Sequence, residues 1–114
     1  MLTKDQILSN VKLNQETVFV KEWGGDVTVS EMSGTMRDAW EQAIQEKDAS
    51  GKLVSVRAKL VVCTVVDEKG ERLFTDEDMP AIGKLSSTVL AKVCEVALRL
   101  NGLGAESIAS AKKN

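Results

Sequence analysis

The stretch from Leu85 to Leu103, "LSSTVLAKVCEVALRLNGL", limits the fold more than any other part of this 114-residue chain. Its apolar residues recur every three or four positions: Val89, Leu90, Val93, Cys94, Val96, Ala97, Leu98 and Leu100. That spacing predicts an amphipathic helix, which Ser86 or Ser87 can cap and Asn101-Gly102 can end. Because its apolar surface is broad, we expect this helix either at the centre of the domain or against a partner.

The first third of the chain has the alternation of a β-hairpin. Two short runs alternate valines with other residues, Val18 and Val20 in the first and Val27 and Val29 in the second. Gly24 and Gly25 lie between the runs, and glycine accepts the positive φ angles of tight turns. A phosphate-binding loop is disfavoured, because neither GxGxxG nor GxxxxGK is present and a strand follows the glycines.

Two helices flank this hairpin in the predicted order. Thr3 and Gln6 have the spacing of a capping box, which predicts a short helix over residues 3–9. Thr35 and Asp38 suggest a second cap, followed by apolar residues at helical spacing: Met36, Ala39, Trp40, Ala43 and Ile44. Trp40 is most simply a core residue, and the alternative is an aromatic side chain facing a partner.

Residues 53–66, "LVSVRAKLVVCTVV", fit two structures. Their many valines favour a strand, whereas Leu53, Val56, Leu60 and Cys63 also fall on one helical face. Propensity alone favours the strand, and the helix remains the alternative.

Composition excludes several classes of function. The chain has no histidine and no tyrosine, which removes imidazole-dependent triads, cysteine–histidine dyads and most transition-metal sites. The net charge of −2 provides no strong field for nucleic acid or an anionic membrane. The start, "MLTKDQILSN", resembles neither a signal peptide nor a membrane span. We therefore expect no cofactor, no nucleic acid and no membrane partner.

The two cysteines leave one enzymatic alternative open. Cys63 and Cys94 lie in apolar runs, which predicts buried free thiols, although a disulfide between them is not ruled out by the sequence. A thiol enzyme would need a histidine or a nearby cation to form the thiolate, and neither cysteine has an obvious one.

An acidic stretch, "VVDEKGERLFTDEDM" at residues 65–79, raises the question of a metal site or an acid/base pair. In a calcium loop starting at Asp67, Lys69 would take a ligand position and Gly70 would be misplaced, because position six is Arg72. Carboxylates in a glycine turn are usually solvated, which disfavours acid/base chemistry. No metal or catalytic residue is therefore predicted.

The same stretch is explained by local structure. Asp67 and Gly70 have the positions of a turn, in which aspartate bonds its own backbone and glycine adopts the left-handed conformation. Thr75 then caps a short helix whose first turn holds three acids, where they complement the helix dipole. Pro80 requires that helix to be short or to restart at Met79.

The order of these pieces resembles a known family. "VFVKEWGGDVTVSEMSGTMRDAWEQ" is a hairpin and a capped helix, "RAKLVVCTVVDEKGERLFTDEDM" ends in D-x-x-G-x-x-L-F-T, and "LSSTVLAKVCEVALRLNGL" ends in Asn-Gly-Leu. Together, over residues 18–103, they resemble the tail assembly chaperones of long, flexible-tailed bacteriophages. The resemblance implies a mostly helical α+β domain with an N-terminal β-hairpin packed on a helical bundle, and a helix at residues 53–66.

The resemblance also implies a function. Members of this family are not enzymes: they bind the long tape measure protein, keep it soluble, help to recruit tail tube protein and leave before the virion is complete. The host cytoplasm and association into oligomers follow from that activity. The alternative is another small phage structural protein, a connector or tube-associated component, that stays in the particle.

The surplus apolar surface of the last helix suggests where a partner would bind. The candidate contact residues are Met79, Ile82, Leu90, Leu98, Leu100 and Leu103. An ordinary core position is the alternative for each of them. We expect a single domain over residues 1–103 and a mobile tail over 104–114, because "GAESIASAKKN" is small and polar. Its final Lys-Lys-Asn can be encoded by a run of adenines, which suits the ribosomal frameshifting that the resemblance implies.

Overall fold

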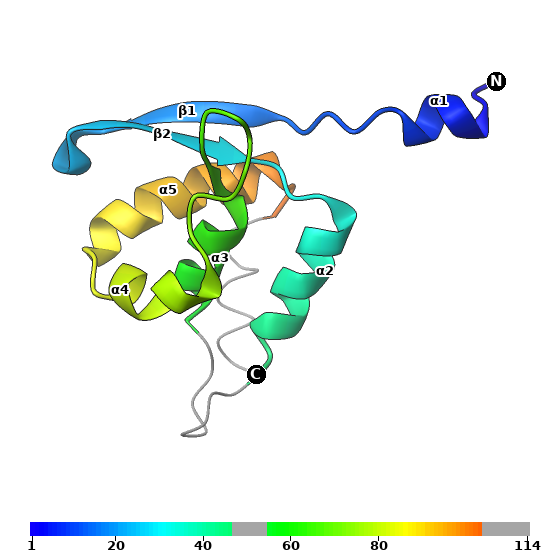
Figure 1. Cartoon of the computed structure of the whole chain (residues 1–114). Coiled ribbons are helices and arrows are strands. Elements are labelled where there is room, and N and C mark those ends of the chain that lie inside the picture. The colour runs from blue at the N-terminus through cyan, green and yellow to red at the C-terminus, as the bar shows by residue number, and fades with distance from the viewer. Residues whose placement is uncertain (47–54, 104–114) are drawn as a thin grey trace.

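The computed structural model describes residues 1–46 and 55–103. Helices and strands follow in the order α1 (Lys4–Leu8), β1 (Gln15–Val20), β2 (Gly25–Ser30), α2 (Gly34–Ala43), α3 (Val56–Thr64), β3 (Val65–Val66), α4 (Met79–Gly83) and α5 (Ser87–Leu100). Helix α3 packs against α2, α4 and α5, and both strands of the hairpin contact α5 (Figure 1). The predicted class, a mostly helical α+β domain with an N-terminal hairpin packed on helices, is confirmed.

The hairpin is antiparallel, with Gln15 opposite Ser30 and Val20 opposite Gly25. Its turn is longer than the two glycines predict. A 3-10 turn over Lys21–Trp23 leads to Gly24, which adopts the left-handed conformation at φ 73°. Gly25 instead begins β2 and has no positive φ, so the turn requires glycine only at position 24.

The ambiguous segment is a helix for most of its described length. Residues Val56–Thr64 form α3, and only Val65–Val66 pair as a strand, opposite Val29 and Thr28 of β2. The strand that propensity favours is therefore wrong for residues 56–64, while the helix implied by the family is right. Almost every residue of α3 is buried, and packing on several sides outweighs the weak strand preference of valine. Residues 53 and 54 lie outside the described part.

Helix α2 begins two residues earlier than predicted. Ser33 is the N-cap, and its side chain accepts a hydrogen bond from the amide of Met36 at 3.2 Å. Thr35 is therefore not the cap but lies in the first turn, because a serine three residues before Met36 already satisfies that amide. Trp40 is almost completely buried, as its simplest interpretation predicts.

The end of α5 is held by two backbone bonds. The amide of Leu103 donates to the carbonyl of Leu98 at 2.7 Å, and that of Gly102 to the carbonyl of Arg99 at 3.2 Å. Gly102 has φ 67°, so the pattern is a Schellman motif. It turns the chain back on the helix and holds Leu103 close to Leu98.

Asn101 links this helix end to the segment before α2. Its Oδ1 accepts a hydrogen bond from the Met32 amide at 2.7 Å, while its Nδ2 donates to the Ala97 carbonyl at 2.8 Å. Arg37 Nη1 also donates to the Asn101 carbonyl at 3.1 Å. The sequence predicts only a helix stop at this residue, whereas the structure shows a contact between distant parts of the chain.

Candidate partner-binding surface

Half of the predicted contact residues belong to the core. Ile82, Leu90 and Leu98 are exposed by only 2, 4 and 7%. Met79, Leu100 and Leu103 are partly buried and pack against the core. The broad apolar face of α5 is thus explained mainly by its central position, and a role of these six residues in partner binding remains a prediction.

A groove nevertheless runs beside α5. It has a volume of about 480 Å³ and is lined by Arg57, Ala91, Cys94, Glu95, Leu98, Arg99 and Leu103. The apolar members come from α5 and from Leu103, three residues beyond its end, and three charged side chains line the groove with them. An apolar floor with a charged rim suits a few apolar side chains of a protein partner, whose own polar groups can meet the rim.

Only Leu98 and Leu103 of the predicted contact residues line this groove. Arg57, Glu95 and Arg99 were not predicted, because their place beside the apolar residues depends on how α3 packs against α5. The position of Leu103 is also set by the Schellman motif, whose Asn-Gly signal is present in the sequence.

Two ion pairs join the hairpin to α5. Arg99 Nη2 lies 2.7 Å from Glu16 Oε2, and Lys92 Nζ lies 2.8 Å from Glu22 Oε2. The Glu16 carboxylate raises the pKa of the Arg99 guanidinium, and the hydrogen bond from Lys92 lowers the pKa of Glu22. These pairs are exposed, so each contributes little stability, but one of them orients a rim residue of the groove.

The acidic stretch has structural contacts. Asp67 Oδ1 accepts hydrogen bonds from the amides of Lys69 at 2.8 Å and Glu71 at 3.0 Å, and Gly70 has φ 82°. This is the turn that the sequence predicts. Within residues 1–46 and 55–103, no three acidic or cysteine side chains are placed to hold a metal ion.

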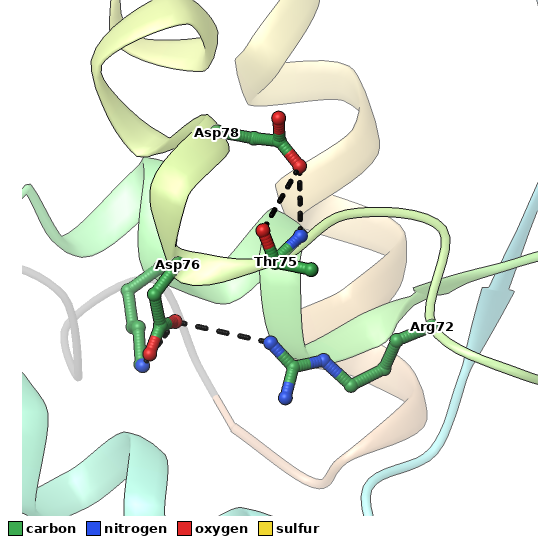
Figure 2. Close-up of polar contacts among 5 residues, drawn as sticks. Arg72, Thr75, Asp76 and Asp78 are labelled. Atoms are coloured by element: carbon green, nitrogen blue, oxygen red, sulfur yellow. Dashed lines mark hydrogen bonds and ion pairs between the residues drawn. The ribbon is translucent and has the colours of Figure 1, made fainter.

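The second half of the stretch begins a helix. Thr75 is the N-cap of a 3-10 turn over Asp76–Asp78. The Thr75 amide donates a hydrogen bond to Asp78 Oδ2 at 2.8 Å, as Figure 2 shows. Helix α4 then restarts at Met79 with Pro80 in its first turn.

Asp76 makes the strongest charge contact in this region. Its Oδ1 lies 2.7 Å from Lys59 Nζ and 3.8 Å from Arg72 Nη2, and Figure 2 shows the arginine pointing toward it. The hydrogen bond from Lys59, with the charge of Arg72, lowers the pKa of Asp76. The pair joins α3 to the 3-10 turn before α4, so this carboxylate helps to hold that turn against α3.

The cysteines are buried, as predicted. Cys63 is a free thiol, and burial raises its pKa, although Lys59 and Arg72 partly oppose this. A raised pKa keeps the thiol protonated at neutral pH, which is the opposite of what a nucleophilic cysteine requires. The Cys94 thiol donates a weak hydrogen bond to the Arg57 carbonyl at 3.8 Å, at the floor of the groove.

No helix in the described part of the chain is long and apolar enough to cross a membrane. The chain is thus a small α+β domain whose acidic stretch forms a turn, a cap and an ion pair, and whose groove beside α5 combines apolar and charged side chains. The model of the phage tail assembly chaperone family matches residues 4–114, so the chain belongs to this family.

A solved structure supports the fold. The chain is similar to the tail assembly chaperone of bacteriophage HK97, with a TM-score of 0.61 and 20% sequence identity over 87% of this chain and 94% of that one. Comparison with curated protein sequences gives no match.

Proposed function

We propose that this chaperone binds the tape measure protein in the host cytoplasm, keeps it soluble and helps to recruit tail tube protein. In this proposal it associates with other copies of itself and leaves before the virion is complete. The observation that carries the proposal is the groove beside α5 in a chain of this family, because it offers apolar surface to a helical partner. Its size limits it to a few side chains, which suits a weak and reversible contact repeated along a long protein.

Leu103 is the residue at which to test the groove, because it lines the groove but is only partly buried. We expect Leu103→Asp to fold and to reduce co-purification with co-expressed tape measure protein at least tenfold. Leu85→Asp is the matched control, since Leu85 is an exposed leucine that does not line the groove. Undiminished capture by a folded Leu103→Asp variant would contradict the groove as the site.

The release step has its own test. Mass spectrometry of purified virions should detect no copy of this chain. Its presence in stoichiometric amounts would favour the alternative, a connector or tube-associated protein.

We further propose a longer product made by ribosomal frameshifting near the codons for Lys112, Lys113 and Asn114. These residues lie outside the described part. The nucleotide sequence tests the proposal, because codons that interrupt the adenine run would remove its basis.

A further inference from the structure

The N-terminal twelve residues, called the arm below, are exposed along their whole length. The arm includes α1, whose capping box is complete: the Thr3 amide donates to Gln6 Oε1 at 2.9 Å and the Gln6 amide to Thr3 Oγ1 at 3.3 Å. Its exposed apolar residues are Met1, Leu2, Ile7, Leu8 and Val11. A five-residue helix is too short to be stable alone in water, so a surface that covers these side chains would complete the fold of the arm.

A second feature lies near the other end of the hairpin. Strand β3 pairs only with Thr28 and Val29 of β2, so Gly25–Val27 has β1 on one side and no strand on the other within the described residues. A cleft of about 500 Å³, called the notch below, opens at this place. Its lining is Asp26, Val27, Thr28, Val66, Asp67, Glu68, Lys69, Glu71 and Leu73.

We propose that the arm of one copy docks in the notch of a second copy. The arm offers apolar side chains with two lysines and one aspartate, whereas the notch has exposed Leu73 among four carboxylates and one lysine. Apolar contact and opposite charge both favour this pairing, and the unpaired edge of β2 supplies backbone groups to the incoming chain. The inference rests on the self-association in the proposed function and assigns a site to it.

The direction of the arm favours docking in the notch of a second copy over docking in the notch of its own chain. The arm joins the body at Asn14, next to the end of β1 that faces Ser30, whereas the notch lies beside Gly25–Val27. Figure 1 shows α1 pointing away from the domain beyond that end of the hairpin. The arm therefore extends away from its own domain, which favours contact with a neighbouring copy, although the turn at one wall of its own notch lies near Gln15 at the base of the arm.

The first experiment identifies the occupant of the notch. An equal mixture of ¹⁴N- and ¹⁵N-labelled full-length chain is treated with a carbodiimide, which joins lysine amines to nearby carboxylates without a spacer. We expect cross-linked peptides between Lys12 and residues 67–71, half of them with one light and one heavy partner. Peptides of unmixed mass only, or no such cross-link in a protein that associates, would overturn the proposal.

The second experiment measures association by sedimentation velocity. Val11 is 81% exposed, so Val11→Asp should leave the fold intact, and we expect the association constant to fall at least tenfold. Leu85→Asp is again the control and should associate like the natural chain. Lys12→Glu and Glu68→Lys should each weaken association, and an equal mixture of the two should recover it, because one arm then again meets a notch of opposite charge.

The outcomes distinguish this proposal from the proposal that the groove binds tape measure protein. A Val11→Asp variant that is monomeric but still captures tape measure protein supports both. A Leu103→Asp variant that loses capture but still associates does the same. Unchanged association of Val11→Asp, or a natural chain that stays monomeric up to millimolar concentration, would contradict the docking of the arm in the notch. Neither result would bear on the groove as the binding site for tape measure protein.

Discussion

At the scale of single residues, Asp76 shows that a carboxylate in an acidic stretch can have a structural role: it pairs with Lys59 of α3. The side chain of Lys59 is only 12% exposed, whereas that of Asp76 is 65% exposed. Folding therefore desolvates most of the Lys59 ammonium group, and the Asp76 carboxylate compensates for the lost hydration. Because the acid is exposed, the stabilisation is smaller than that of a fully buried pair.

We predict that Asp76→Asn lowers the free energy of unfolding by about 1–2 kcal/mol at pH 7, because it leaves Lys59 without its carboxylate. The pKa of Asp76 lies below its ordinary value of 3.8 in the folded protein, so the contribution is complete only above about pH 5 and is lost as the pH falls through the lowered pKa. Urea unfolding of both chains between pH 7 and pH 2.5 measures the difference.

The control for this prediction is Glu68→Gln, which removes an exposed carboxylate of the same stretch. We expect it to change stability by less than about 0.5 kcal/mol. A difference between the natural chain and Asp76→Asn that persists unchanged to pH 2.5 would show that the substitution acts by something other than charge.

At the scale of elements, the ends of helices depend on a few positions that the sequence only partly identifies. Gly102 has φ 67° in the Schellman motif, and the space around it is open. The cost of a side chain there is therefore conformational rather than steric. Gly83 provides a comparison, since it ends α4 with no positive φ and also has open space.

We predict opposite effects for alanine at these two glycines. Gly102→Ala should lower the free energy of unfolding by about 1 kcal/mol, because alanine is strained in the left-handed conformation. Gly83→Ala should raise it by about 0.5 kcal/mol, because it restricts the unfolded chain without strain. Thermal and urea unfolding of both variants measure the two changes. Equal signs would mean that the two helix ends do not differ in backbone conformation as described.

Predictability from the sequence also differs between elements. The hairpin and α5 could be predicted from periodicity, because each has one clear buried face. Helix α3 could not, since a segment buried on several sides has no clear polar face: its spacing fitted a strand and a helix, and the order of motifs decided for the helix. Ser33 and Thr35 are both good caps, so the start of α2 depended on tertiary packing that spacing does not show.

At the scale of the whole molecule, the candidate surface was the least predictable part. Periodicity identified the apolar residues of α5 but not which of them the other elements cover. Ile82 and Leu90 are core residues because α3 lies against α4 and α5. The groove depends on charged residues of two helices, and the notch depends on a strand of only two residues. Such surfaces arise from tertiary arrangement, so a linear pattern carries little information about them.

The central position of α3 leads to a prediction for the whole fold. Leu60 is completely buried, and α3 contacts α2, α4 and α5. We expect Leu60→Ala to lower the free energy of unfolding by about 3 kcal/mol, through lost apolar contact and the cavity left behind. Because α3 joins the helices and β3 continues it into the sheet, the loss should affect hairpin and helices together.

Two optical probes measure this coupling. Circular dichroism follows the helices, and Trp23, at the hairpin turn, reports the hairpin by fluorescence once Trp40 is replaced by phenylalanine. In that background, Leu60→Ala should shift both urea midpoints by the same amount, as a two-state domain requires. Leu73→Ala, at a leucine that is 54% exposed, should leave both midpoints nearly unchanged. Separate midpoints would show that the hairpin unfolds independently of the helices, which the pairing of β2 with the strand that ends α3 argues against.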